Sequence, residues 1–258
     1  MAETWKTAVT SIAPNEIHVR GFRIDEMMGR VSFGEAVYLI LRGELPGAAV
    51  GRVVEAMLVA SIDHGVTPPS ALAVRNAATT GAPLNACLAA GALAVNRHHG
   101  GAVEDCMRLL ARGASAVTAG APPAAAAAAL IAEEKAVGRR LPGWGHRVHT
   151  DDPRSGRLLA LVKEAGVAGP HIAVAEAIAG ELAKGGKKLP LNVDGAIAAV
   201  LADLGFPPEL ANGFFILART AGWMAHFAEE LARERPMRRI DQAAAEYDGP
   251  QPRILNDR

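Results

Sequence analysis

Apolar residues along this chain recur mostly at spacings of three and four, which place them on one face of a helix. Strict alternation of polar and apolar residues over five or more positions, the pattern of a half-buried strand, is hard to find. Most apolar stretches end at a glycine or a charged turn, and several begin with proline, as helices do. The predicted helices cover residues 32–43, 50–60, 68–81, 83–95, 121–138, 151–166, 171–186, 193–205 and 207–234. The pattern therefore predicts an all-α protein of about ten helices.

Length and composition are those of an ordinary globular protein. A chain of 258 residues, 50% of them hydrophobic, can enclose one large core or a core with a smaller lobe. Lys and Arg together number 27, and so do Asp and Glu, so no overall field would attract nucleic acid or an acidic membrane. The most apolar window, residues 121–132, is well short of the roughly 20 residues that span a bilayer. We therefore expect small molecules or other subunits as partners, and no nucleic acid or membrane.

The cysteines and the N-terminal residues indicate a cytoplasmic protein. Cys87 and Cys106 are too few for a disulfide framework and lack the Cys-x-x-Cys spacing of metal sites, which suits a reducing compartment. Residues 1–16 contain an early acidic residue and no long apolar run, unlike a signal peptide. The chain also lacks the phosphate-loop, dinucleotide, serine-esterase and zinc-protease motifs, so the common forms of those functions are excluded.

Four histidine-containing segments stand out: DHG at 63–65, HHGG at 98–101, GHRVH at 145–149 and AHFAEE at 225–230. A single histidine of this kind is more often structural or on the surface than catalytic. Three of the four segments, however, lie at breaks between apolar helices. There a side chain can point into a cleft, and glycine lets a ligand approach the backbone. These breaks are candidate parts of a binding site.

Three charged residues near these breaks are further candidates. Asp194 lies at the start of a strongly apolar helix, where it can be an N-cap or a general base. Arg154 follows the expected helix cap Asp152, beside backbone N–H groups that favour an anion; alternatively, Arg154 and Arg157 only solvate the helix surface. Arg219 interrupts the apolar run GFFILARTAGW, where an unpaired guanidinium would be costly. It needs an anionic partner, either a protein carboxylate or a substrate carboxylate.

Four segments, HHGGAVED, GWGHRVHTDDPR, LPLNVDG and FILARTAGWMAHFAEE followed by RP, occur in an order and spacing that resembles the citrate synthase superfamily. The family patterns are H-G-G-A-x-E, G-x-G-H-R-V with D-P-R, N-V-D, and A-R-x-x-G-W-x-A-H-x-x-E with R-P. The match extends from about Asp63 to about Pro250. The resemblance implies a citrate-synthase-like helical fold and carbon–carbon bond chemistry on a coenzyme A thioester.

The resemblance implies acid–base roles for three residues. Asp194, at the N-V-D aspartate, would take a proton from the methyl group of an acetyl thioester, while His99, at the H-G-G histidine, would stabilise the enol oxygen. Both are needed because a thioester methyl is only weakly acidic, so its proton leaves as the carbonyl oxygen gains a hydrogen bond. His146, at the G-H-R-V histidine, would donate to the 2-oxo oxygen of oxaloacetate, or hold the citryl hydroxyl during cleavage.

The resemblance also implies binding residues. His64, Arg154 and Arg219 would hold substrate carboxylates, and Arg235 would reach the active site of a partner subunit. The residues that would lie along coenzyme A are Gly143, Trp144, Gly145 and Arg147. The coenzyme A thioester is then a substrate, and neither a metal nor a tightly bound cofactor is expected.

Departures from the citrate synthase pattern favour cleavage of citryl-CoA to acetyl-CoA and oxaloacetate. Only 62 residues precede the DHG segment, so the chain is close in size to stand-alone citryl-CoA lyases and to the citrate-synthase-like module of ATP-citrate lyase. LNVDGAIAAV and NGFFILAR also resemble those lyases. His99 favours the alternative, a citrate synthase or a related 2-oxoacid and acyl-CoA condensing enzyme, because the ATP-citrate lyase module has an aromatic residue there. A synthase must also hydrolyse the citryl thioester with a water held in a closed site.

The family architecture implies two helical domains. Residues 1–103 and 206–258 would form the larger domain and the face of an intertwined homodimer, and residues 104–205 would form the smaller one. Closure of the cleft between them would bring Asp194 towards the thioester.

Two other classes of function are weaker. A non-catalytic citrate- or CoA-binding protein would keep the arginines and the glycine turn but lose the acid–base residues, all of which are present. A metal protein would use His98, His99, Glu104 and Asp105, but the two acids more naturally stabilise a helix N-terminus after Gly101.

Overall fold

The computed structural model describes residues 4–146, 149–186, 189–239 and 241–254 of the chain. Its helices are α1 (Ile24–Met27), α2 (Phe33–Arg42), α3 (Ala48–Ala60), α4 (Pro69–Thr79), α5 (Leu84–Leu93), α6 (Ala102–Thr118), α7 (Pro123–Ala136), α8 (Pro153–Glu164), α9 (Pro170–Lys184), α10 (Val193–Asp203) and α11 (Ala211–Arg233), with short 3₁₀ turns η1 (Pro208–Leu210) and η2 (Gln242–Ala244). Each predicted helix is present with ends close to the expected ones. The helical fold class is thereby confirmed.

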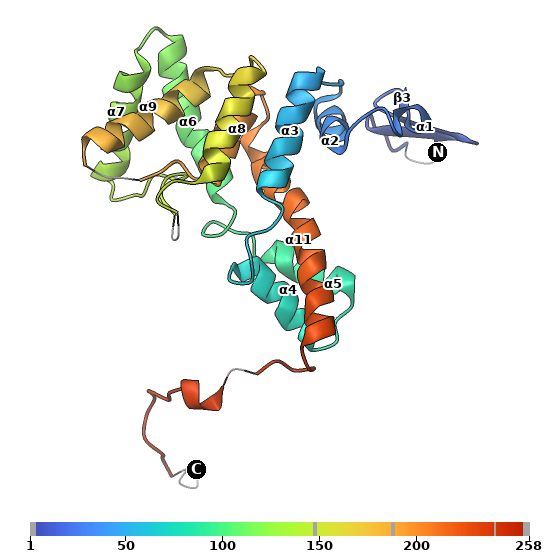
Figure 1. Cartoon of the computed structure of the whole chain (residues 1–258), viewed down its shortest axis with the longest axis vertical. Helices are drawn as coiled ribbons and strands as arrows, with labels where there is room; N and C mark the ends of the chain where they lie inside the picture. The colour runs from blue at the N-terminus through green and yellow to red at the C-terminus, as the bar shows by residue number, and fades with distance from the viewer. Residues whose placement is uncertain (1–3, 147–148, 187–188, 240, 255–258) are drawn as a thin grey trace.

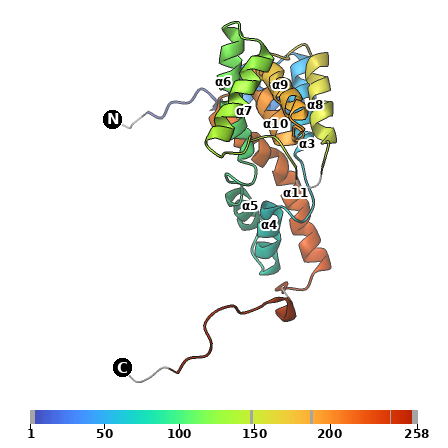
Figure 2. The same ribbon diagram turned by 90° about the vertical axis from the view of Figure 1, so that its left-hand side faces the viewer.

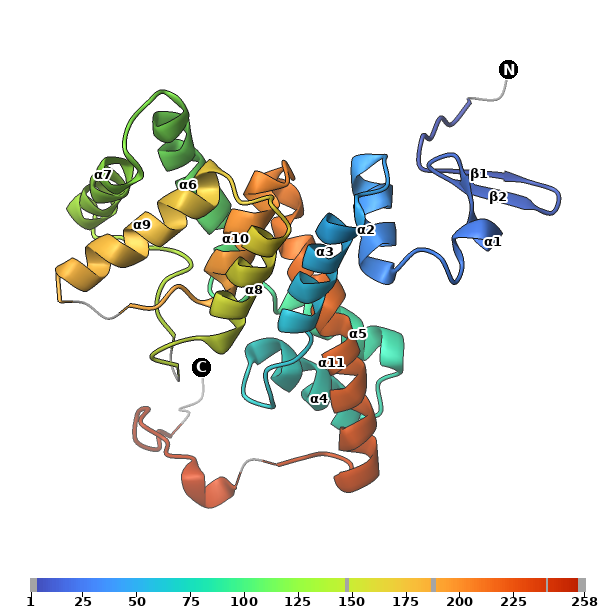
Figure 3. The same ribbon diagram turned by 45° about the horizontal axis from the view of Figure 1, so that its top comes forward.

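Residues 10–23 form a small sheet that the hydrophobic pattern did not predict. Strands β1 (Thr10–Ala13), β2 (Glu16–Val19) and β3 (Phe22–Arg23) are antiparallel in the order β1-β2-β3. The expectation of no strands was wrong here because the strands are short and mostly exposed, so no alternation over five positions could mark them. The sheet lies beyond α2, at the opposite edge of the molecule from α7 and α9 (Figure 3).

Local capping explains several helix boundaries. Ser32 and Glu35 form a reciprocal capping box at the start of α2, and Gly43 ends that helix at a φ of 90°. At the start of α8 the Asp152 side chain accepts a hydrogen bond from the Arg154 N–H, and proline occupies the first helical position, as the sequence predicts.

Two hydrophobic cores lie along α11. The larger one combines buried residues of α2, α3 and α6–α10 with Phe214 and Ala218 from the first half of α11. The smaller one surrounds Trp223 and is formed by α4, α5 and the second half of α11. Figure 1 and Figure 2 show this arrangement, with α4 and α5 against one end of α11 and the other helices around its opposite end. The division into domains at residues 104 and 205 stays a prediction.

The longest helix is α11, with 23 residues. At 1.5 Å per residue it is about 34 Å long, which lets it contribute to both cores. Among the described residues, none of the helices is both long and apolar enough to cross a membrane.

Candidate active site

The predicted site residues lie at breaks between packed helices. His64 follows α3, His99 precedes α6, and His146 lies in the segment before α8. Helix α3 packs against both α8 and α11, and α10 packs against α6 and α8. The ends of these helices therefore bring residues that are distant in sequence into one region (Figure 1).

Three histidines form a cluster at the break between α3 and α8. The ring centroid of His64 lies 5.3 Å from that of His146 and 6.0 Å from that of His149. The centroids of His146 and His149 are 4.4 Å apart, and the backbone N–H of His149 donates to Nδ1 of His146 over 3.0 Å. The sequence gives no role to His149, because nothing in a linear pattern shows that its ring folds back onto His146.

The electrostatic surroundings keep two of these imidazoles neutral. Burial, followed by the positive charge of Arg154, lowers the pKa of His64 below its ordinary 6.5. Burial and the neighbouring His149 likewise lower the pKa of His146. Both rings are therefore mostly uncharged at neutral pH.

His99 is held from two sides. Its Nε2 lies 2.8 Å from the hydroxyl oxygen of the buried Ser70, and its ring meets that of Phe215 edge-on at 5.8 Å. The following Gly100 has a φ of 75°, and a Cβ there would come within 2.7 Å of Val95. Glycine at this position is required for the turn that presents His99.

Asp194 is the second residue of α10 and not its cap. The cap is Asn192, whose side chain accepts from the N–H of Gly195 over 3.1 Å. The capping alternative for Asp194 is therefore wrong, and its carboxylate is available for another role. Burial raises the pKa of Asp194, while the positive charges of Arg154 and Arg219 act against that rise. A carboxyl with a raised pKa holds a proton more readily, as acid–base catalysis requires.

Arg154 is part of a buried ion pair. Its Nε and Nη2 donate to the two carboxylate oxygens of Asp152 over 3.0 and 2.9 Å. Asp152, 1% exposed, also accepts from the backbone N–H of Val193 over 3.1 Å, so it connects the starts of α8 and α10. Surface solvation fits only Arg157, which is exposed and pairs with Glu164 over 3.3 Å. Whether Arg154 also holds a substrate carboxylate stays a prediction.

Arg219 is a buried cation whose direct contacts are a carbonyl oxygen and an aromatic ring. It is 3% exposed, its Nε donates to the carbonyl oxygen of Ser61 over 2.8 Å, and its guanidinium lies over the ring of Phe215 at 4.7 Å. Within the described ranges, no carboxylate comes within ion-pair distance, 4.0 Å, of Arg219. Burial lowers the pKa of Arg219, and the negative charges of Asp63 and Asp194 act in the opposite direction. The sequence offered two kinds of anionic partner for Arg219, a protein carboxylate and a substrate carboxylate. Among the described residues, no protein carboxylate forms an ion pair with it.

The turn at residues 143–145 is fixed to the start of α10. The carbonyl oxygen of Gly143 accepts from the backbone N–H of Asn192 over 2.9 Å, and the Asn192 side chain donates to the carbonyl oxygen of Gly145 over 2.8 Å. Gly143 has a φ of 89°, and a Cβ there would lie 2.7 Å from both Cys106 Sγ and the Cα of Gly195. The backbone must therefore approach α10 more closely than any side chain would permit.

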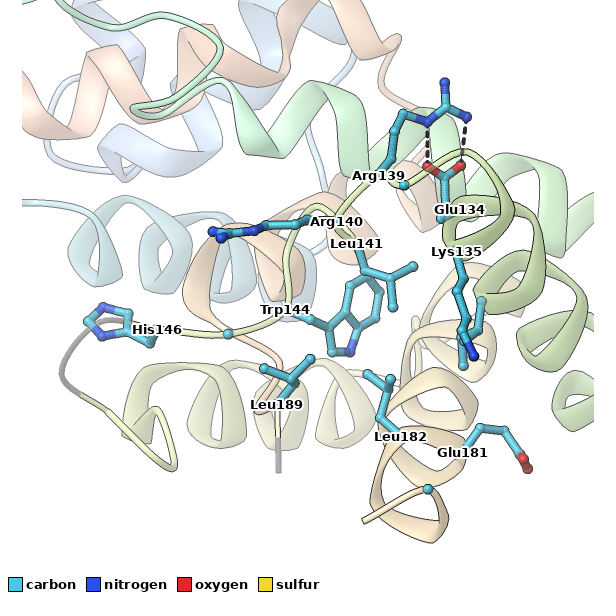
Figure 4. Close-up of a pocket in the computed structure, with 14 residues that line it drawn as sticks. Glu134, Lys135, Arg139, Arg140, Leu141, Trp144, His146, Glu181, Leu182 and Leu189 are labelled. Atoms are coloured by element: carbon cyan, nitrogen blue, oxygen red, sulfur yellow. Dashed lines mark hydrogen bonds and ion pairs between the residues drawn. The ribbon is translucent and has the colours of Figure 1, made fainter. Parts of the chain in front are cut away.

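This turn forms part of the wall of a pocket of about 820 Å³. Its lining includes Leu141, Trp144, Leu182 and Leu189, which give it an apolar interior beside His146 (Figure 4). Trp144 is 8% exposed, and its Nε1 has no hydrogen-bond partner among the residues that the structure describes. An apolar pocket with an unsatisfied donor suits a ligand that is mostly apolar with a few polar atoms.

A second pocket of about 540 Å³ adjoins the first and is rich in arginine. The two pockets share Glu134, Arg139 and Arg140. Glu134 accepts hydrogen bonds from Arg139 over 2.7 and 3.1 Å and from Arg112 over 2.8 Å. The basic residues that line the second pocket are Arg97, His98, Arg108, Arg112, Arg139 and Arg140. Glu134 and Asp105 in the lining offset part of this positive charge, as do Glu104 and Glu209, which pair with Arg108.

One predicted residue, Arg235, stands apart from this region. Arg235 is exposed and follows the end of α11. At 1.5 Å per residue, Arg233 lies about 21 Å along the helix from Arg219, so Arg235 does not serve the Arg219 region of its own chain. Arg147 lies outside the described residues.

The residues of the alternative metal set have other partners or lie on the surface. Glu104 binds Arg108 over 2.8 Å, and His99 binds Ser70, while His98 and Asp105 are exposed. The acids lie in the first turn of α6, as the helix-start interpretation predicts.

A helical fold, acid–base side chains at helix breaks and a coenzyme-sized pocket define the class of protein. Residues 47–240 match the family model of the citrate synthase C-terminal domain, and the chain belongs to the citrate synthase family. The expected family and its helical fold are confirmed.

Three relatives show which proteins of known structure or curated function this chain resembles. The chain is similar to the structure of citryl-CoA lyase from Hydrogenobacter thermophilus, with 42% identity, a TM-score of 0.89 and 98% of each chain covered. An ATP citrate lyase from Methanosaeta concilii, 22% identical with a TM-score of 0.80, shares the fold over 97% of this chain and 42% of its own. A citrate synthase from Haloferax volcanii is 27% identical over 81% of this chain and 54% of its own. This chain spans about half the length of the curated relatives that it matches.

Proposed function

We propose that this protein is a citryl-CoA lyase, which cleaves citryl-CoA into acetyl-CoA and oxaloacetate. The observation that carries the proposal is Arg219, a buried cation with no carboxylate within ion-pair distance in the described chain, whose charge acts from farther away on the raised-pKa Asp194. A dicarboxylate such as oxaloacetate would supply the missing anion through two N–H donors. The 42% identity to a citryl-CoA lyase over nearly the whole of both chains supports the same substrate.

The raised pKa of Asp194 is compatible with the cleavage direction. During cleavage the citryl hydroxyl loses a proton as its oxygen becomes a carbonyl, and the electron pair of the broken carbon–carbon bond remains on the thioester fragment. That fragment, stabilised at its enolate oxygen by His99, then takes a proton from the carboxyl of Asp194. A raised pKa favours the protonated carboxyl that this step needs.

Two neutral histidines would handle the hydroxyl group. Because Nδ1 of His146 accepts from the backbone, its neutral ring carries the proton on Nε2 and donates to the substrate oxygen. The neighbouring neutral His64 would accept the hydroxyl proton and pair with a substrate carboxylate once charged. Arg154 would neutralise a second carboxylate.

The two pockets would divide coenzyme A between them. The thioester arm would follow Gly143, Trp144 and Gly145 into the apolar pocket, with Trp144 Nε1 as a donor. The phosphates would face the arginines of the adjoining pocket, which carry the charge that phosphate groups require. Arg147 is proposed for coenzyme A from the sequence alone.

We propose a homodimer with the predicted domains, residues 1–103 and 206–258 against 104–205. Large apolar side chains on α4, α5 and α11 are exposed, namely Leu72, Leu93, Met224 and Leu231. The exposed Arg235 would then enter the partner subunit's site. Mixing D194N and R235A proteins should restore part of the activity that each has lost, and no recovery after subunit exchange would reject a shared site.

The proposed location is the cytoplasm. Two buried free thiols, Cys87 and Cys106, are consistent with it.

The presence of His99 favours the alternative, a citrate synthase. A single assay separates this alternative from the lyase. Citryl-CoA, and separately acetyl-CoA with oxaloacetate, are supplied while thioester absorbance and free thiol are followed together. A lyase converts citryl-CoA to acetyl-CoA without free thiol, whereas a synthase releases coenzyme A from the condensation. Binding of both ligands without either reaction would indicate a non-catalytic binding protein.

A further inference from the structure

The three-histidine cluster has the donor set of a transition-metal site. One ring nitrogen each of His64, His146 and His149 lies within 4.8 Å of the other two. Two of these rings already belong to the proposed site, but His149 has no part in the proposed reaction. It is the third nitrogen, contributed by His149, that changes a pair of imidazoles into a potential chelate.

The geometry is close to that of a bound ion. Zinc–nitrogen bonds of about 2.0–2.1 Å in a tetrahedral site put the ligand nitrogens about 3.4 Å apart, so side-chain shifts of roughly 1 Å would close the cluster. Binding by His146 also requires its proton to move from Nε2 to Nδ1, or Nδ1 to exchange the His149 N–H for the ion. His146 and His149 belong to one loop and already contact each other, while His64 comes from the break after α3. His64 is exposed, so an ion can enter from solvent and keep an open fourth position.

The type of ligand selects the type of ion. Imidazole nitrogens suit Zn²⁺, Cu²⁺ and Ni²⁺, whereas Mg²⁺ and Ca²⁺ prefer oxygen. Both cysteines are buried, so no exposed thiol competes for the ion in the folded protein. The guanidinium of Arg154 is nearby, but its charge is offset by the bidentate pair with Asp152.

We propose that His64, His146 and His149 bind one late transition-metal ion, with Zn²⁺ as the probe, and that this ion blocks the active site. The block rests on the proposed function, because the ion would occupy the nitrogens that hold the citryl hydroxyl and a carboxylate. Metal binding itself does not depend on that function.

His149 provides the critical variant. Replacing it by alanine removes one ligand but keeps the backbone N–H that orients His146, and zinc inhibition of this variant is measured against its own zinc-free turnover. Loss of even an outer partner of a metal ligand costs about 10- to 100-fold in affinity, so H149A should weaken zinc binding on the order of tenfold or more. The matched control is H18A, which removes a histidine of β2 outside both the cluster and the two pockets.

The test is a calorimetric titration of the substrate-free full-length protein with ZnCl₂, and with MgCl₂ for comparison. We expect one Zn²⁺ per chain for the wild type and H18A, markedly weaker binding for H149A and H64A, and no Mg²⁺ binding at the same concentrations. Equal zinc binding by H149A and the wild type, or no saturable binding by the wild type, would overturn the site. Circular dichroism of each variant shows whether it is folded, and H64A provides the second ligand test.

Activity is a separate measurement. Zinc should inhibit citryl-CoA turnover by the wild type and H18A, and EDTA should reverse the inhibition. H149A should be inhibited only at a much higher zinc concentration. Turnover that zinc leaves unchanged at saturating occupancy would refute the block. Saturable, His149-dependent zinc binding by a protein that turns over no thioester would instead reject the proposed function and leave the metal site in place.

Discussion

Substitution of Gly143 by alanine tests the proposal that the coenzyme A turn must lie directly against α10. The new Cβ would lie 2.7 Å from the backbone Cα of Gly195 and 2.7 Å from Cys106 Sγ, and Gly143 has a φ of 89°. The left-handed backbone costs a non-glycine residue about 1–2 kcal/mol. Overpacking against backbone adds about 1–3 kcal/mol. We therefore expect G143A to lose about 2–5 kcal/mol of unfolding free energy.

Gly145 provides the matched control for this prediction. Its φ is 88°, but a Cβ there would meet only Leu189, at 3.5 Å, which is an ordinary contact. G145A should therefore lose only the backbone contribution, about 1–2 kcal/mol. Urea unfolding of both variants and the wild type at one protein concentration measures the difference, since dimerisation would make stability concentration-dependent. Equal losses in the two variants would show that close packing on α10 is not what requires glycine at position 143.

Three further predictions concern the chemistry of the site. D194N should lower the turnover number by about 10²- to 10⁴-fold. The affinity for oxaloacetate should change little, because the arginines and not Asp194 hold the carboxylates. Steady-state kinetics measure the turnover and calorimetry measures oxaloacetate binding; an unchanged turnover number would contradict the prediction. R219L should raise the oxaloacetate KM or Kd about tenfold to a hundredfold, because a hydrogen bond to a charged group is worth about 1.5–3 kcal/mol. The surface control R157L should leave both constants unchanged. A normal KM for R219L would mean that the arginine is only structural. The pKa values of His64 and His146 are lower in the folded protein than in the unfolded chain, so the unfolded chain takes up protons first as the pH falls through 6.5. The unfolding free energy should therefore decrease below that pH. Urea midpoints at several pH values measure the decrease, and an H64A protein with the same pH dependence as the wild type would count against His64 as its source.

Much of the fold could be predicted because its helices are bounded by local signals. Proline at helix starts, glycine at helix ends and the Asp152 cap are properties of neighbouring residues, so they are visible in the sequence. The sheet at residues 10–23 was not visible because its strands depend on each other and not on burial. The sequence left Asp194 open as a helix cap or a general base, and only the hydrogen bond from the Gly195 N–H to the Asn192 side chain shows that Asn192 is the cap.

The site was predictable in its members but not in their partners. The resemblance to the citrate synthase family supplied the residues, but the position of the His149 ring depends on how one loop folds. The partner of Arg219 depends on distances across three helices, and the sequence left a protein carboxylate and a substrate carboxylate equally open. Only the three-dimensional arrangement shows a guanidinium that meets a carbonyl oxygen and an aromatic ring.

One carboxylate connects the parts of this site. Asp152 caps α8, grips the guanidinium of Arg154 and accepts the backbone N–H of Val193, the residue before Asp194. A buried carboxylate with three sets of donors is costly to disturb, because removing any partner leaves charge unsatisfied in the interior. Its pKa is held low by the hydrogen bonds from Arg154 although burial alone would raise it, so it stays charged while Asp194 is shifted in the opposite direction. Two aspartates that lie close together are thus given different tasks by their surroundings: Asp152 fixes the geometry as a permanent anion, and Asp194 remains able to exchange a proton.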